Sequence, residues 1–140
     1  MYRTLDGSET GYYDNIQKRW VADNSYAAAV EEAHAFGRYV CAHAYTPEAI
    51  TRAAECGVRT IEHGNLIDAA GAKEIKKAGA YLVPTMVTYE AISREGKSYG
   101  ITEHQIQKIN MAREKSVEGL THAYRAGCKI GSGSDLLGDM

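Results

Sequence analysis

One pattern repeats along the chain: a helix-like segment, a glycine, and then a short apolar run that ends in polar residues. The glycines suit the left-handed position that closes a helix, because glycine has no Cβ to clash there. The short runs are rich in bulky or β-branched residues, which is typical of strands buried on both faces of a parallel sheet. The alternation predicts an α/β fold with right-handed crossovers. The glycines are Gly37, Gly57, Gly79 and Gly127, and the runs cover residues 39–42, 58–61, 81–83 and 128–130.

A helix is predicted before each of the four strands, and three of these helices have clear start signals. Thr46 and Pro47 supply a cap and a proline at the first helical position. Asp68 can cap the next helix, and Thr102 with Gln105 forms a capping box for a long one. The predicted helices cover residues 24–36, from 47 to about 56, from 68 to 78 and from 102 to about 126.

The composition describes one globular domain. The chain has 140 residues, of which 44% are hydrophobic and 24% charged, and its formal net charge is -2. Scattered Lys and Arg residues argue against nucleic-acid binding, which needs clustered positive charge. No apolar run approaches the roughly 20 residues that cross a bilayer, so no membrane role is expected. The cysteines are odd in number and apolar in context, which favours a reducing compartment over a disulfide framework.

The first 20 residues differ from the rest, being polar and rich in Gly and Tyr with no helical or strand period. This segment is predicted to be a loop or a tail. It is neither basic nor apolar enough for a secretory signal, so we expect a cytoplasmic protein. A long irregular segment is unusual in a compact domain, so we expect that it either covers a functional site or is the stub of a longer chain.

Two histidines stand at equivalent places in consecutive repeats. His43 lies six residues after Gly37, and His63 lies six residues after Gly57. Each is therefore expected at the carboxyl end of its strand, and neighbouring parallel strands are about 4.8 Å apart. Two side chains at such positions can reach one metal ion, and α/β folds place ligands at this end of the sheet.

Asp135 is the third candidate, at the end of the sequence GSGSD that follows the last strand. Its carboxylate could bind the same ion or accept a proton from metal-bound water. The same segment could instead be a flexible turn, or could bind a phosphate group through its backbone N–H groups. The sequence leaves these alternatives open.

Other polar residues near strand ends are weaker candidates. Tyr45 could direct its hydroxyl at a substrate carbonyl, and Thr85 and Thr88 could line a pocket after the third strand. Glu62 should contact the helical layer or a neighbouring loop, because side chains alternate along a strand and His63 faces the opposite way. The remaining histidines fall within predicted helices and are expected to be packing or surface residues, namely His34, His104 and His122.

Four segments together resemble the amidohydrolase superfamily, and within it the imidazolonepropionase-like branch that contains Xaa-Pro dipeptidases. The resemblance implies a (β/α)8 TIM barrel with one or two divalent metal ions, usually zinc. It also implies that His43 and His63 bind metal from strands five and six, that Asp135 binds metal and transfers the proton from strand eight, and that Tyr45 contacts the substrate. The segments are 41–45 (CAHAY), 61–64 (IEHG), 82–85 (LVPT) and 131–135 (GSGSD).

The resemblance covers only part of such a barrel. The chain has no His-x-His motif, which family members carry on strand one, and 140 residues are fewer than the about 250 of a whole barrel. We therefore expect residues 24–140 to be a half-barrel of strands five to eight, with residues 1–23 as the active-site loop after strand four. Half a barrel has open edges and an unclosed inner face. A second copy or the missing half is the expected partner, and the isolated chain is expected to be inactive.

The implied reaction is hydrolysis of an amide-like C–N bond in a small substrate, such as a dipeptide or a cyclic amide. A metal ion would activate water, and Asp135 would take its proton and pass it to the leaving nitrogen. Two alternatives remain: a protein that binds a phosphate ligand through the GSGSD loop, and a non-catalytic βα module that needs a partner chain.

Overall fold

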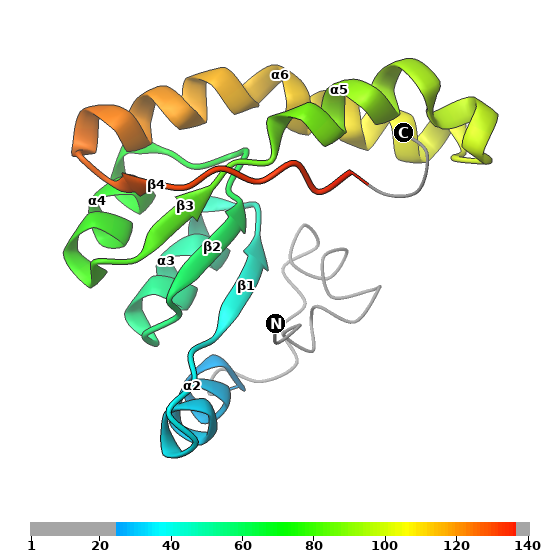
Figure 1. Cartoon of the computed structure of the whole chain (residues 1–140). Coiled ribbons are helices and arrows are strands. Elements are labelled where there is room, and N and C mark those ends of the chain that lie inside the picture. The colour runs from blue at the N-terminus through cyan, green and yellow to red at the C-terminus, as the bar shows by residue number, and fades with distance from the viewer. Residues whose placement is uncertain (1–24, 137–140) are drawn as a thin grey trace.

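The computed structural model describes residues 25–136, in which parallel strands alternate with helices (Figure 1). Four strands pair side by side in the order β1-β2-β3-β4, so the predicted α/β arrangement is confirmed. The loop predicted for residues 1–23 lies outside the described residues. The elements are α2 (Ser25–Ala35), β1 (Cys41–Ala44), α3 (Pro47–Glu55), β2 (Thr60–His63), α4 (Ala69–Ala78), β3 (Tyr81–Val83), α5 (Met86–Glu95), the 3-10 helix η2 (Gly96–Tyr99), α6 (Glu103–Ala126) and β4 (Lys129–Ile130).

The three predicted helix starts are capped as expected. The Ala49 N–H donates to the Thr46 hydroxyl at 3.3 Å, and the Gly71 N–H donates to the Asp68 carboxylate at 2.7 Å. At the start of α6, the backbone and side chain of Thr102 and Gln105 bond reciprocally, which is the predicted capping box. All four repeat glycines have a positive φ, between 62° and 88°. Local sequence therefore sets most of the element boundaries.

Two features differ from the prediction. Strands β1 and β2 begin two residues later than expected, at Cys41 and Thr60. Helices α5 and η2 were not predicted at all, because the segment after Thr85 begins Met-Val-Thr-Tyr, and β-branched and aromatic residues favour strands. Packing against α6 outweighs this weak preference.

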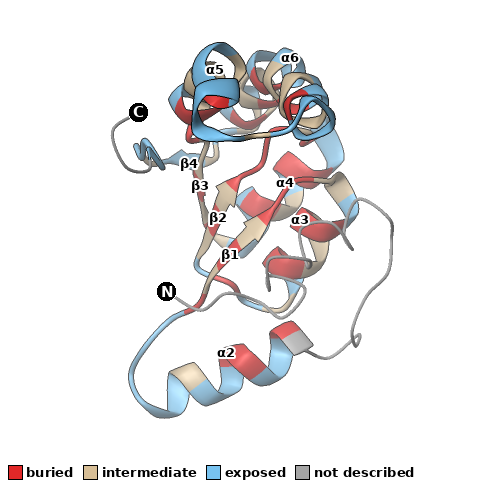
Figure 2. Ribbon diagram, turned by 90° about the vertical axis from the view of Figure 1, so that its right-hand side faces the viewer, coloured by how far each residue is buried: buried red, intermediate tan, exposed pale blue. Residues whose placement is uncertain are grey.

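The core lies on one face of the sheet. Apolar side chains of the strands pack there against α3, α4 and the end of α6, and Figure 2 shows the buried residues gathered on that side. The prediction that the strands are buried on both faces is wrong: buried and half-buried residues alternate along β1 and β2, and both residues of β4 are exposed. Among the described residues no helix covers the second face, which we call the open face.

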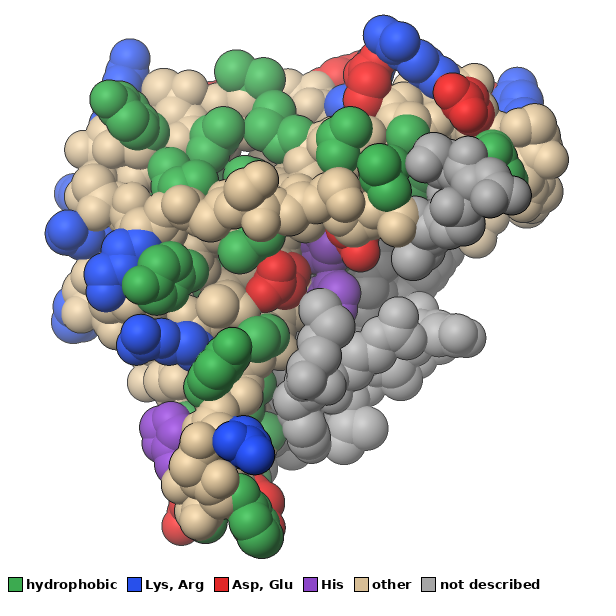
Figure 3. Space-filling view, in the orientation of Figure 1, with side chains coloured by type: hydrophobic (Ala, Val, Ile, Leu, Met, Phe, Trp, Pro, Cys, Tyr) green, Lys and Arg blue, Asp and Glu red, His purple; other side chains and the backbone are tan. Residues whose placement is uncertain are grey.

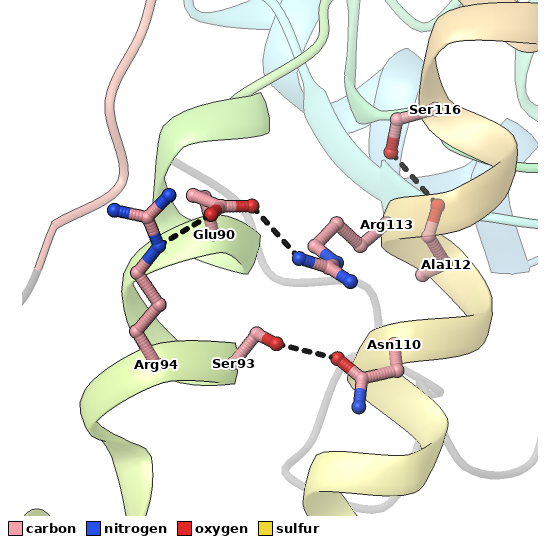
Figure 4. A network of polar contacts seen from close by, with 7 residues as sticks. All are labelled: Glu90, Ser93, Arg94, Asn110, Ala112, Arg113 and Ser116. Atoms are coloured by element: carbon pink, nitrogen blue, oxygen red, sulfur yellow. Dashed lines mark hydrogen bonds and ion pairs between the residues drawn. The ribbon is translucent and has the colours of Figure 1, made fainter.

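Helices α5 and α6 lie side by side beyond the carboxyl ends of the strands (Figures 1 and 2). Polar contacts join them (Figure 4): Arg113 Nη1 donates to Glu90 Oε2 at 2.9 Å, and Ser93 Oγ donates to Asn110 Oδ1 at 2.6 Å. The Arg113 bond holds the pKa of the Glu90 carboxyl below its ordinary value, and Arg94 acts in the same direction. In the part of the chain that the structure describes, no helix could cross a membrane.

Candidate active site

The structure brings His43 and His63 into direct contact. Nδ1 of His43 lies 2.6 Å from Nε2 of His63, although the residues are 20 positions apart in sequence. The two rings are also stacked, with centroids 4.8 Å apart. Histidine and acidic side chains lie together near the middle of the open face (Figure 3). His63 is the last residue of β2 and His43 is the last but one of β1, so the pair lies at the carboxyl end of the sheet, where ligands of such folds bind.

The two histidines are not at matched positions of the sheet. The partner of His63 across the strands is Ala44, and the partner of His43 is Glu62. His63 has a left-handed backbone with φ 75°, which takes it out of strand alternation and lets its ring reach His43. Glu62 consequently shares the open face with His43, and its carboxylate accepts a hydrogen bond from the Thr60 hydroxyl. The expectation that Glu62 contacts the helical layer is therefore wrong.

Gly64 completes this strand end. Its own φ is 60°, and an added Cβ would lie only 2.4 Å from the Leu82 side chain. Its N–H donates to the carbonyl of Ala44 at 3.0 Å. The His-Gly pair therefore turns the chain sharply while keeping it bonded to the neighbouring strand.

Aromatic rings surround the His63 imidazole and bury it to 3% exposure. The Tyr45 ring stacks on it with centroids 4.7 Å apart, and the Tyr89 ring meets it edge-on at 5.9 Å. Burial is the main cause that lowers the His63 pKa to about 3, and the neighbouring His43 charge adds to it. The ring is therefore neutral at physiological pH. Tyr89 was not predicted as a site residue because helix α5 was not predicted. Tyr89 is four residues after Thr85, and this spacing places two residues on the same face of a helix.

Thr85 holds the other side of the same ring. Its Oγ1 lies 2.7 Å from Nδ1 of His63, and the residue is only 4% exposed. Its backbone is left-handed, with φ 30°, which is rare for a β-branched residue. The predicted substrate contact of Thr85 stays a prediction, because the structure shows its hydroxyl bonded to His63. Thr88 is buried within α5 rather than at a strand end.

Asp135 follows β4 on an exposed loop, also with a left-handed φ of 53°. The loop stays close to β3: the Gly131 N–H donates to the carbonyl of Leu82 at 2.8 Å. A Cβ added to Gly133 would lie 2.8 Å from the Val83 side chain. Close packing of the loop on β3 thus explains why glycine is present at positions 131 and 133. From the sequence alone, these glycines could also have belonged to a phosphate-binding loop.

The donor atoms fit a metal ion in their chemistry. Zinc binds neutral imidazole nitrogens, and the nitrogens that face each other are Nδ1 of His43 and Nε2 of His63. A catalytic zinc site takes three protein ligands. Within residues 25–136, no group of three or more His, Cys, Asp or Glu side chains is assembled that could hold an ion. Two candidate ligands are therefore in contact, and the metal-binding roles of His43, His63 and Asp135 stay predictions.

Acidification from pH 7 to pH 5 is expected to lower the free energy of unfolding of the metal-free chain by about 2 kcal/mol. The His63 pKa is 6.5 in the unfolded chain and about 3 in the folded one. Between these values the unfolded state binds more protons, so stability rises with pH across this window and levels off above it. Urea denaturation at several pH values measures the slope. His63→Gln should flatten it, whereas His104→Gln, on an exposed helical residue, should not; an equal slope in His63→Gln would contradict a buried neutral ring.

Comparison with known proteins agrees with this geometry. Residues 15–140 match the profile of the Amidohydrolase family. No curated protein matches the chain significantly. A solved prolidase in complex with N-methylphosphonate-L-proline is 47% identical, with a TM-score of 0.81 over 84% of this chain.

Two further solved structures are similar. A putative prolidase from Bifidobacterium longum is 30% identical with a TM-score of 0.71 over 81% of this chain, and a Xaa-Pro dipeptidase with bound methionine is 28% identical with a TM-score of 0.73 over 82%. This chain spans 29% of the first prolidase, 30% of the putative prolidase and 29% of the dipeptidase.

Proposed function

Because this chain belongs to the amidohydrolase family, we propose that it supplies the metal-binding half of a barrel hydrolase that cleaves the C–N bond of a dipeptide ending in proline. The observation that carries the proposal is the contact of two imidazole nitrogens at the carboxyl end of the sheet. The contact joins the buried ring of His63 to the half-buried ring of His43, at the end of the sheet where ligands of such folds bind. In this proposal residues 24–140 form the half-barrel.

Each residue of the site has a part in this hydrolysis. His43 and His63 would hold a divalent ion, zinc by its preference for imidazole, and a bound ion supplies a more acidic water and a polarised carbonyl. Asp135 accepts a proton from the attacking water and passes it to the leaving nitrogen. Tyr45, whose ring stacks on His63, would direct its hydroxyl at the substrate. The rings of Tyr45 and Tyr89 keep water away from the His63 ring.

The relatives favour a dipeptide over a cyclic amide. The 47% identical structure is a prolidase that was solved with a phosphonate derivative of proline. The structure from Bifidobacterium longum is a putative prolidase, and the third relative is a Xaa-Pro dipeptidase. A substrate with proline on the leaving side of the scissile bond is therefore the best supported choice.

A chimera tests the proposal in a complete barrel. Residues 25–140 replace the matching segment of the 47% identical prolidase, and the zinc-loaded chimera is assayed for release of proline from Xaa-Pro dipeptides. We expect hydrolysis, with the unmodified prolidase as the positive control. A folded, zinc-binding chimera without activity on any Xaa-Pro dipeptide would contradict the proposal. Stabilisation of this chain by inorganic phosphate but not by zinc would favour the phosphate-ligand alternative.

A further inference from the structure

We propose that Thr85 is a positioning residue, whose buried hydroxyl accepts a hydrogen bond from Nδ1 of His63 and so fixes the tautomer with a free lone pair on Nε2. The inference rests on the proposed function, because that lone pair is the one that faces His43. Thr85 acts through His63 and touches neither substrate nor metal in this assignment.

The first argument is a comparison of helix caps. The caps of α3, α4 and α6 are Thr46, Asp68 and Thr102, all with extended backbones and side chains that accept a bond from their own helix. Thr85 is at the same position of α5, but its backbone is left-handed and its side chain makes no capping bond. Its hydroxyl is bonded to His63 instead, at 2.7 Å. The Thr85 side chain therefore bonds to the His63 imidazole instead of capping helix α5.

The second argument comes from the protons of the His63 ring. An imidazole that binds a metal ion is neutral, so in the proposed function the ring carries one proton on its two nitrogens. It donates one of its two bonds, to Thr85 or to His43, and accepts the other. Only the arrangement with the proton on Nδ1 leaves Nε2 able to bind an ion. Partners of this kind on the far nitrogen of a histidine ligand set its tautomer and orientation.

The third argument is that water cannot replace the hydroxyl. Thr85 is 4% exposed and His63 is 3% exposed. The ring is also held by Tyr45 and by Tyr89, which is one helical turn after Thr85 in α5. Loss of the hydroxyl therefore leaves Nδ1 without a partner in a buried place, and the competing tautomer, bonded through Nε2 to His43, becomes favoured.

Zinc affinity of the 140-residue chain, measured by competition with a chromophoric chelator, gives the first test. Thr85→Val keeps the shape and removes the hydroxyl, and we expect it to weaken zinc binding about 10–100-fold. Thr85→Ser restores the hydroxyl and should bind within about threefold of the natural chain, on the same expectation. Thr88→Val is the matched control, since Thr88 is 3% exposed in the same helix and should leave the affinity unchanged. Equal affinity of Thr85→Val and the natural chain would overturn the proposal.

The second test reads the tautomer directly, first in the natural chain and then in the two variants. Nitrogen chemical shifts of His63 in the zinc-free natural chain, above pH 7, should show the proton on Nδ1. Thr85→Val should move it towards Nε2, and Thr85→Ser should not. A proton on Nε2 in the natural chain would overturn the role of Thr85. Failure of the natural chain to bind zinc would instead count against the proposed function, while the tautomer would still decide the role of Thr85.

Discussion

Asp135→Asn should lower the kcat of the chimeric prolidase by about 10²–10⁴-fold while leaving its fold intact. Asparagine has the shape of aspartate but cannot accept the proton of the attacking water. It also tolerates the left-handed backbone of this position, where φ is 53°. The loss is therefore expected in kcat, and the KM for a Xaa-Pro dipeptide should change much less. Steady-state kinetics of the zinc-loaded chimera measure both constants.

Ser134→Ala is the control for Asp135→Asn. Ser134 is the exposed neighbour in the same loop, so its replacement should leave kcat within about twofold, as is usual for surface positions. Zinc content of each variant separates loss of the base from loss of the ion. If Asp135→Asn retains full zinc content and more than half of the activity, Asp135 is not the group that transfers the proton.

His43→Gln and His63→Gln should each weaken zinc binding by the chain more than the 10–100-fold that is typical for loss of an outer partner such as Thr85. Each variant removes one of the two nitrogens that face each other at 2.6 Å. The double variant should bind little more weakly than either single one, because two residues that hold one ion do not contribute independently. Competition with a chelator gives the three affinities.

His104→Gln is the matched control, because His104 is an exposed residue of α6. Circular dichroism of each variant shows whether it folds. Folded single variants that bind zinc as tightly as the natural chain would remove the metal site from the proposal. The chain would then retain its family and its fold without a place for the ion.

Helix caps and closing glycines could be predicted because they depend on neighbours in sequence. Thr46, Asp68 and Thr102 each bond to a backbone group of their own helix, within three residues. Helix α5 could not be predicted, because contacts with α6 far along the chain stabilise it against the preference of its first residues. The core on one face of the sheet was not predicted either. A strand of three or four apolar residues has the same sequence pattern whether one face of the sheet is covered or both are.

The candidate site was predictable in its residues but not in its geometry. The spacing from the glycines placed His43 and His63 at strand ends, and the fold brings the two rings together. The shift by one register position depends on the left-handed backbone of His63, which no spacing reveals. The bond between Thr85 and His63 joins residues 22 positions apart and needs α5 to exist. Side-chain partners that come from different strands are visible only once the chain is folded.

Three residues with side chains, His63, Thr85 and Asp135, have left-handed backbones among the described residues, and all follow or end a strand. Glycine would adopt these conformations at lower cost than threonine does. Selection for folding alone would thus exchange Thr85 for glycine early, whereas selection for catalysis would retain it. On the proposed function, a descendant of this chain that has lost the site should show glycine at position 85 before the histidines change.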